Sequence, residues 1–330
     1  MIETINLTKR YGELVALNNL NLTINEGDCF GFIGPNGAGK TTTIKILATL
    51  LKPSSGQANI GGLTVGYQNR QIRPLIGYVP DFMGAYEDMV VTEYLEFFAA
   101  SYGIHGPQRK KVIGDVLELT DLSYKATAEV NSLSRGMQQR LSVARVLLHD
   151  PRVLLMDEPA SGLDPRARIE MRELLKELRR MGKTILISSH ILPELAELCN
   201  VVGIIERGQL LFSGTVEEIV RRAKMGHVLH VGVTERVEQA VELLSKIPGV
   251  KKASILSDAD VPAAVMNTSA KAKGGAGSRV IQVSYDDEGG YSFTDIPNIL
   301  INQGFRLTKF TEEPVNLETA FMRLTKGMVQ

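Results

Sequence analysis

Residues 34–42 read GPNGAGKTT, and this short stretch constrains the fold more than any other part of the sequence. An apolar run at residues 29–33 precedes it, and apolar residues at helical spacing follow it. A buried strand, a glycine-rich turn and a helix start form the setting of a phosphate-binding P-loop. The pattern therefore predicts a site for a nucleoside triphosphate where one strand meets one helix.

The residue types in this stretch suit phosphate chemistry. Glycines let the backbone turn its N–H groups toward an anion, and the dipole of the following helix adds positive potential there. Lys40 is expected to reach the β- and γ-phosphates, and the Thr41 hydroxyl is expected to bind Mg²⁺. The expected nucleotide contacts are Gly34, Asn36, Gly37, Gly39, Lys40, Thr41 and Thr42.

Two adjacent carboxylates, Asp157 and Glu158, follow a second apolar run at residues 153–156. Charges at the end of a buried strand need compensation, because burying an unpaired charge is costly. Mg²⁺ would compensate Asp157, and Glu158 would then be free to orient or deprotonate an attacking water. The alternative is a solvated pair at a strand end, and the P-loop favours the metal-site interpretation.

Two further side chains are candidates for the same site. Tyr11 ends the first expected strand and could stack on an adenine base, although the position taken alone favours packing on the sheet. His190 follows the strand expected at residues 184–188. Ligands collect at strand ends in open α/β sheets, so we favour a γ-phosphate contact for His190 over a purely structural role.

Helix-start signals recur along the chain. Thr92, Ser134 and the pair Asp164–Pro165 each precede a helical pattern and are predicted to begin helices. Thr215 and Glu218 have the spacing of a capping box. Together with short antiparallel strands expected within residues 2–24, these signals predict an α/β fold.

Composition excludes some functional classes. Lys plus Arg (37) equals Asp plus Glu (37), so no electrostatic argument favours nucleic acid as a partner. The longest apolar runs fall short of the roughly 18 residues that a membrane span needs, and residues 1–10 do not resemble a leader peptide. We therefore expect a cytoplasmic protein. Cys29 and Cys199 have apolar neighbours and are expected to be buried free thiols.

Taken together, these motifs resemble the ATP-binding domain of ABC transporters over residues 1–224. The resemblance implies a P-loop NTPase fold with an antiparallel β subdomain and a helical subdomain, and it implies ATP and Mg²⁺ as cofactors. The motifs that carry it are the A-loop aromatic at Tyr11, Walker A at residues 34–42, Walker B at residues 153–157, the catalytic glutamate at Glu158, the D-loop at residues 161–164 and the switch histidine at His190.

Two positions depart from the family pattern. The signature, usually LSGGQ, reads LSRGM here, so Ser134 and Gly136 match while Arg135 and Met137 do not. The Q-loop glutamine position is occupied by Asp81, which could bind Mg²⁺ or hold the attacking water and which adds negative charge near the phosphates.

Within the family, the chain looks most like the ATPase subunits of bacterial and archaeal exporters of drugs, lipids or ions. That resemblance implies a separately encoded membrane permease, which would hold the protein at the inner face of the cell membrane. It also implies a homodimer that sandwiches two ATP molecules, with Ser134 and Gly136 of one copy completing the site built on Lys40 of the other.

Two alternative functions remain open. One is a soluble ABC ATPase that acts on nucleic acid or the ribosome, which the short interval between P-loop and signature and the single ATPase domain disfavour. The other is a nucleotide-regulated binding module without turnover. Glu158 and His190 disfavour that alternative, because a module that only binds needs no catalytic base.

The pattern changes near residue 226. From there the elements are expected in the order β-α-β-β-α-β with a final helix at residues 317–324, which suggests a ferredoxin-like α+β module over residues 225–330. Residues 257–279 interrupt this order with Ala, Gly, Ser and Lys and are expected to form a mobile insertion. The region has no catalytic cluster, so we expect it to regulate or dimerise.

Overall fold

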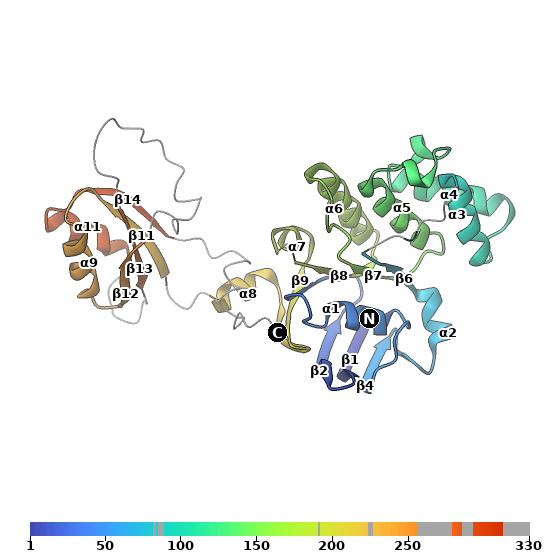
Figure 1. The fold of residues 1–330 in the computed structure, drawn as a ribbon, viewed down its shortest axis with the longest axis horizontal. Helices are drawn as coiled ribbons and strands as arrows, with labels where there is room; N and C mark the ends of the chain where they lie inside the picture. Colours follow the sequence, from blue (N-terminus) through green and yellow to red (C-terminus); the bar gives the residue numbers. More distant parts are fainter. Residues whose placement is uncertain are drawn as a thin grey trace. The chain divides into compact units, whose positions relative to one another are not determined.

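The computed structural model describes residues 1–81, 84, 89–190, 192–223, 227–256, 279–285 and 293–312. The chain separates into two compact units, Met1–Ile219 and Val220–Ala320 (Figure 1). Each unit has a hydrophobic core of its own. In the described part of the chain, no helix is both long enough and apolar enough to cross a bilayer.

The first unit contains an antiparallel sheet with the strand order β2-β1-β4-β5. Its strands are β1 (Ile2–Tyr11), β2 (Leu14–Ile24), β4 (Ser55–Ile60) and β5 (Leu63–Thr64). The strands predicted within residues 2–24 are therefore confirmed as β1 and β2, which place Ile2 opposite Ile24.

A six-stranded sheet with the order β10-β9-β3-β8-β7-β6 forms the second layer of this unit. Its strands are β3 (Cys29–Ile33), β6 (Ile76–Val79), β7 (Val153–Asp157), β8 (Thr184–Ser189), β9 (Val201–Glu206) and β10 (Gln209–Gly214). All are parallel except β10. Every residue of β3, β7 and β8 is buried, because both faces of a parallel sheet are covered.

Helices cover both faces of this parallel sheet. Helix α1 (Lys40–Leu47) lies between the two sheets and contributes to the core that joins them (Figure 1). On the opposite face lie α5 (Arg135–Leu147), α6 (Pro165–Arg180) and α7 (Leu192–Leu198). The remaining helices of this part of the chain are α2 (Asn69–Ile72), α3 (Val91–Ser101), α4 (Gly106–Leu119) and α8 (Val216–Ala223).

Three of the predicted helix starts are confirmed. Ser134 caps α5, and its Oγ accepts the Met137 N–H at 3.3 Å. Asp164 caps α6 by accepting two backbone N–H groups through one carboxylate oxygen. Thr215 and Glu218 exchange hydrogen bonds of 3.1 and 2.8 Å, as a capping box requires.

The predicted N-cap at Thr92 is wrong. Helix α3 begins one residue earlier, after the extended residue Val90, so Thr92 lies within the first helical turn. Its hydroxyl donates instead to the carbonyl oxygen of Ala126 at 2.7 Å. This partner is distant in sequence, so no local pattern indicates it.

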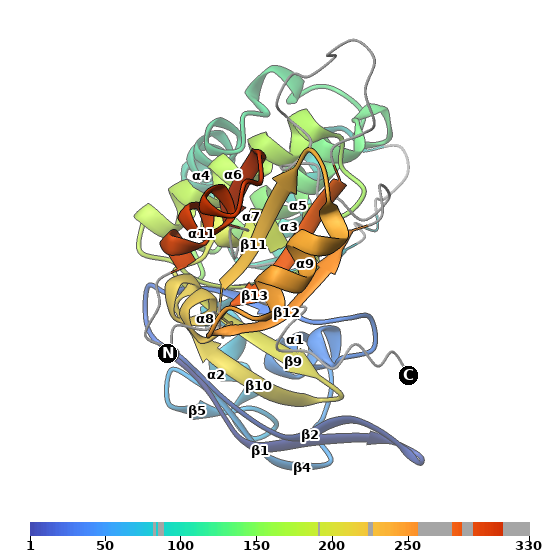
Figure 2. The ribbon, with the colours of Figure 1, turned by 90° about the vertical axis from the view of Figure 1, so that its left-hand side faces the viewer.

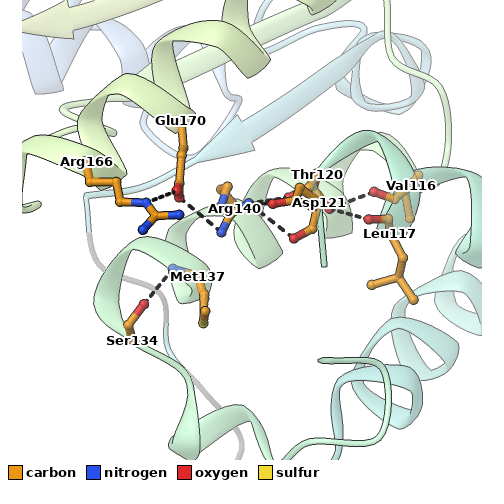
Figure 3. Close-up of polar contacts among 9 residues, drawn as sticks. All are labelled: Val116, Leu117, Thr120, Asp121, Ser134, Met137, Arg140, Arg166 and Glu170. Carbon is orange, nitrogen blue, oxygen red and sulfur yellow. Dashed lines mark hydrogen bonds and ion pairs between the residues drawn. The ribbon is translucent and has the colours of Figure 1, made fainter. Parts of the chain in front are cut away.

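One buried guanidinium joins three helices of the first unit (Figure 3). Arg140 of α5 donates to the Thr120 carbonyl at the end of α4 at 2.9 Å. It also pairs with the carboxylates of Asp121 at 3.2 Å and Glu170 of α6 at 3.3 Å. Glu170 in turn pairs with Arg166, whose side chain is 90% exposed. Arg140 is buried and contacts both the end of α4 and α6. It therefore links α4 and α5 to α6, one of the helices that cover the parallel sheet.

The second unit is an antiparallel sheet with the order β12-β13-β11-β14. Helices α9 and α11 lie on one face of it and fill its core with residues such as Leu244 and Leu300 (Figures 1 and 2). In chain order the elements are β11 (His227–Val233), α9 (Val237–Ser245), β12 (Val250–Ile255), β13 (Arg279–Tyr285), α11 (Ile296–Asn302) and β14 (Leu307–Glu312). The insertion predicted at residues 257–279, except for residue 279, and the helix predicted at residues 317–324 lie outside the described residues.

The two cysteines are buried free thiols, as predicted. Cys29 begins β3 and Cys199 follows α7, and their Sγ atoms lie 3.7 Å apart. Burial raises the pKa of the Cys199 thiol well above its ordinary value, and its interaction with the neighbouring Cys29 thiol raises it further.

The Arg140 network predicts a difference between two arginines that share one carboxylate. Arg140→Met keeps an apolar stem but leaves the Thr120 carbonyl and Glu170 without their buried partner, so we expect unfolding free energy to fall by about 2–4 kcal/mol. Arg166→Met removes an exposed pair on the same Glu170 and should cost about 0.5 kcal/mol or less. Urea denaturation of both variants measures the difference. Equal losses would contradict the assignment of Arg140 as the buried link.

Candidate nucleotide-binding site

The P-loop lies between the end of β3 and the first residue of α1, and its glycines make close contacts. A Cβ atom on Gly34 would lie 2.3 Å from the Ile205 carbonyl oxygen, so no larger residue fits there. Gly39 has a φ of 110°, and its Cβ would lie 2.8 Å from the Ala16 carbonyl oxygen. The loop is therefore pressed between β9 and β2, which fixes its backbone in the curled form.

Lys40 is the first residue of α1, and its side chain is buried. The ammonium donates to the carbonyl oxygens of Gly34 at 2.6 Å and Pro35 at 3.2 Å, and it lies 3.9 Å from Glu158 Oε1. Burial lowers the pKa of Lys40, while the carboxylates of Glu158 and Asp157 act against that shift. The positive charge of Lys40 is thus held at the sheet edge by its own loop and by two acidic residues.

Asp157 ends β7, and one of its carboxylate oxygens joins two other elements. Oδ1 accepts hydrogen bonds from Thr41 Oγ1 of α1 at 3.0 Å and from Ser188 Oγ of β8 at 2.7 Å. The parallel register places Asp157 beside Ser188, which brings the ends of β7 and β8 together. The buried carboxylate that the sequence singled out is therefore hydrogen-bonded to the P-loop threonine.

Glu158 and His190 lie in contact at the same edge. Glu158 has a φ of 49°, in the left-handed region, and its N–H donates to Ser188 Oγ at 3.0 Å and to the Ser188 carbonyl at 3.1 Å. His190 Nδ1 lies 2.6 Å from Glu158 Oε2. An ionised carboxylate can only accept, so Nδ1–H donates in that state. The side chain of Glu158 thus lies between the ammonium of Lys40 and the imidazole of His190.

A cavity of about 240 Å³ opens along the P-loop. Tyr11, with 47% of its surface exposed, lines this cavity together with residues 14–16 of β2, and Lys40 and Glu158 line it as well. The structure therefore places the predicted A-loop aromatic, the P-loop and the predicted base around one space. The cavity-lining residues predicted from the sequence are Tyr11, Asn36, Gly37, Gly39, Lys40, Thr41, Thr42 and Glu158.

The signature residues do not line this cavity, among the residues that the structure describes. Ser134 is exposed at the start of α5 (Figure 3). Gly136 is buried against α6, and its Cβ would lie 2.6 Å from the Ala167 Cβ. The guanidinium of Arg135 covers Gly162 of the D-loop, whose Cβ would lie 2.4 Å from Nη1. Within one chain, Arg135 of the signature thus packs on the D-loop, and no described signature residue lines the cavity at the P-loop.

Asp81 lies just beyond β6, the strand next to β7, and is exposed. It is not among the described residues that line the cavity. It does influence Tyr78 of β6, because burial first, and then the charges of Asp157 and Asp81, raise the pKa of Tyr78 to about 12. The negative field of Asp81 therefore reaches the sheet edge where Asp157 lies.

Sequence reasoning missed two residues at this site. Ser188 holds both Asp157 and Glu158, and the signal that could have found it was a polar residue at the end of an apolar strand. Arg207, in the turn between β9 and β10, lines the cavity. No local motif indicates that residue, because its place depends on how the turn packs against the P-loop.

Comparison with known proteins shows which family this chain resembles. A family model described as ABC transporter matches residues 17–161. A Nod factor export ATP-binding protein I from Burkholderia orbicola is 40% identical over 219 residues, which cover 66% of this chain and 72% of that protein. The linearmycin resistance ATP-binding protein LnrL from Bacillus subtilis is 31% identical and covers 80% and 86%. The bacitracin transport ATP-binding protein BcrA from Bacillus licheniformis is 43% identical and covers 64% and 68%.

Solved structures match the same part of the chain. One described as an ATP-binding subunit of an ABC transporter has a TM-score of 0.61 and 28% identity, and the match covers 67% of this chain and 92% of that one. A dimeric ATP-binding cassette bound to ADP and phosphate has a TM-score of 0.58 and 28% identity, with coverage of 65% and 98%. With Lys40, Asp157 and Glu158 arranged as described, these matches show that the chain belongs to the ABC transporter ATPases, the subunits that bind and hydrolyse ATP to power transport.

Proposed function

We propose that this chain powers export through a separately encoded membrane permease, as one half of a homodimer. The observation that carries the proposal is the arrangement of Lys40, Asp157 and Glu158 at one sheet edge beside a cavity. The names of the relatives, which concern Nod factor export, bacitracin transport and linearmycin resistance, support export over action on nucleic acid or the ribosome. The protein would then work in the cytoplasm, at the inner face of the membrane.

In the proposed mechanism, Glu158 accepts the proton of a water that attacks the γ-phosphorus of ATP. His190 supports this role, because its contact with Oε2 at 2.6 Å orients the carboxylate. Lys40 binds the β- and γ-phosphates with an ammonium whose position the loop carbonyls already fix. Tyr11 stacks on the adenine at the exposed end of the cavity.

The oxygen atoms at this edge fit a magnesium ion. Thr41 Oγ1 and Asp157 Oδ1 are hard ligands 3.0 Å apart, and Mg²⁺ in nucleotide sites takes few protein ligands and completes its shell with phosphates and water. When bound, the ion would neutralise charge on the β- and γ-phosphate oxygens. Asp81, one strand away, would sense the state of the γ-phosphate and pass it to residues 85–102, the segment that the family resemblance implies contacts the permease. Of that segment, residues 85–88 lie outside the described residues.

A second cavity, of about 610 Å³, is a candidate docking place for the permease. It is lined by residues of the helical region and of the segment before β6, among them Arg73, Tyr102 and His149. The ring centroids of Tyr102 and His149 lie 4.2 Å apart, with the ring planes tilted by 33°. Tyr102 ends the segment 85–102 that contacts the membrane subunit in the family, which supports this assignment.

The assignment of Glu158 as the base leads to a test by charge-neutral substitution. Glu158→Gln should keep ATP binding but lower turnover by ~10²-fold or more, because the amide cannot accept the proton. Lys40→Ala should lose nucleotide affinity instead. Glu13→Gln, an exposed glutamate near Tyr11, is the matched control and should hydrolyse ATP normally. Phosphate release and ATP titration separate the two effects. Near-normal hydrolysis by Glu158→Gln would contradict the assignment of Glu158 as the base.

We also propose that each active site is shared between two copies. The signature residues Ser134 and Gly136 lie away from the cavity of their own chain, while Lys40 and Glu158 lie together within it. In an ATP sandwich, the exposed Ser134 of one copy would face the P-loop of the other. The dimeric cassette among the similar structures supports this arrangement.

Mixing experiments test the shared site. Lys40→Ala subunits mixed with Ser134→Arg subunits form heterodimers with both defects in one site and none in the other, so activity should recover. Lys40→Ala mixed with Glu158→Gln is the matched control. Those two residues belong to the same site, each heterodimer site carries one defect, and activity should stay low. Recovery in both mixtures, or in neither, contradicts the shared site.

For the second unit we propose a ferredoxin-like fold and a role in regulation or dimerisation. Its chain order and its sheet order β12-β13-β11-β14, with both helices on one face, support that fold. The proposed division places the ATPase in residues 1–224 and this accessory domain in residues 225–330. A contact between two accessory domains would raise the effective concentration of the ATPase domains for each closure.

Truncation after residue 224 tests the accessory role. The shortened protein should bind Mg²⁺-ATP with unchanged affinity but should be more monomeric without nucleotide, because the second contact between copies is gone. Light scattering without nucleotide, beside an ATP titration, measures both properties. Loss of ATP binding by a folded truncated protein would mean that the second unit belongs to the site, and an unchanged dimer fraction would exclude dimerisation.

A further inference from the structure

Arg207 is a second cation at the nucleotide cavity, and it comes from an element outside the nucleotide motifs. Of the described residues that line the cavity, Lys40 and Arg207 are the two that carry positive charge. Lys40 is buried beside Glu158, whereas Arg207 is exposed. The lining of the cavity therefore includes one buried cation and one exposed cation.

The backbone at Arg207 is held firmly against the P-loop. Its neighbour Gly208 donates its N–H to the Ala38 carbonyl at 2.9 Å and accepts from the Asn18 N–H at 2.9 Å. A Cβ atom on Gly208 would lie 2.7 Å from the Ala16 carbonyl oxygen, so the backbone of the turn packs closely against β2. These contacts tie the β9–β10 turn to both the P-loop and β2, and they fix where the side chain of Arg207 begins.

The conformation of Arg207 is unusual for its residue type. It has a φ of 49°, in the left-handed region, where Asn, Asp and Gly are the common residues. Among the described non-glycine residues with positive φ, two line this cavity, Glu158 and Arg207. The hairpin itself requires this conformation, because a two-residue turn that joins antiparallel strands takes a positive φ at both central residues, here Arg207 and Gly208. The turn would accept asparagine or aspartate equally well, so its geometry alone does not account for the arginine.

The geometry of the cavity indicates which part of ATP Arg207 contacts. Lys40 at the buried end takes the β- and γ-phosphates, and Tyr11 at the exposed side takes the base. The α-phosphate and ribose lie between the two, and the turn that carries Arg207 is tied to both flanks of the cavity, to Ala38 of the P-loop and to Asn18 of β2. A guanidinium donates paired hydrogen bonds to phosphate oxygens, and ribose offers no charge to attract it.

We propose that Arg207 is a nucleotide-binding residue that contacts the α-phosphate of ATP and ADP. This inference rests on the proposed nucleotide site. Because the α-phosphate is present before and after hydrolysis, Arg207 contributes equally to binding substrate and product. It should therefore set affinity and not the rate of the chemical step.

The test uses substitutions that separate charge from backbone conformation. Arg207→Asn removes the charge but suits the left-handed backbone, so the turn should keep its structure. It should weaken binding of both ADP and a non-hydrolysable ATP analogue by about 5- to 20-fold. Arg207→Lys keeps a charge and should lose only about 2- to 3-fold. For hydrolysis by Arg207→Asn, KM should rise while kcat at saturating ATP stays unchanged.

Arg10→Asn is the matched control, because Arg10 is exposed, lies next to Tyr11 and does not line the cavity. It removes the same charge nearby and should leave affinity unchanged. An equal loss of nucleotide affinity in Arg10→Asn would overturn the proposal, because any positive charge near the cavity would then have the same effect as Arg207. Unchanged affinity in Arg207→Asn, or a loss for the ATP analogue without one for ADP, would overturn it too.

Calorimetric titration of the full chain, with thermal melting as a check on folding, measures these outcomes. The unsubstituted protein and Lys40→Ala are titrated alongside. If the unsubstituted protein binds the analogue and Lys40→Ala does not, the nucleotide site is correct, and the Arg207 variants test the new contact alone. If the unsubstituted protein binds neither nucleotide, the proposed site fails, and this inference fails with it.

Discussion

A single carboxylate oxygen, Asp157 Oδ1, holds the site together. It accepts from Thr41 of α1 and from Ser188 of β8, so the P-loop helix and two parallel strands meet at one atom. Such a buried carboxylate is tolerated only because it has these donors and the Lys40 ammonium nearby. The same Ser188 hydroxyl also orients the backbone of Glu158. The position of the proposed base therefore depends on the same hydrogen bonds that satisfy Asp157.

Local patterns in the sequence predicted the parts of the fold that depend on neighbouring residues. The P-loop, the caps at Ser134 and Asp164 and the capping box at Thr215 are each decided within a few residues, and each is present. The buried strands of the parallel sheet could be predicted for the same reason, since an apolar run is itself the signal.

The features that could not be predicted depend on contacts between distant segments. Thr92 has the composition of an N-cap, but its hydroxyl is recruited by the Ala126 carbonyl. Arg207 reaches the cavity only because its turn is tied to the P-loop. The roles proposed for Ser134 and Gly136 depend on a second copy of the chain, which a single subunit does not contain. The Arg140 network could not be predicted either, because Arg140 of α5 pairs with Asp121, just after α4, and with Glu170 of α6, which are distant in the sequence.

The buried thiols have a practical consequence for following this protein in motion. Cys29 and Cys199 are almost inaccessible, and the raised pKa of Cys199 leaves little of the reactive thiolate at neutral pH. Both native thiols should therefore react slowly with maleimide dyes and spin labels. A cysteine introduced on an exposed surface would take up the label selectively without prior removal of the native pair. Distance measurements between two labelled subunits could then follow opening and closing in the otherwise unaltered chain.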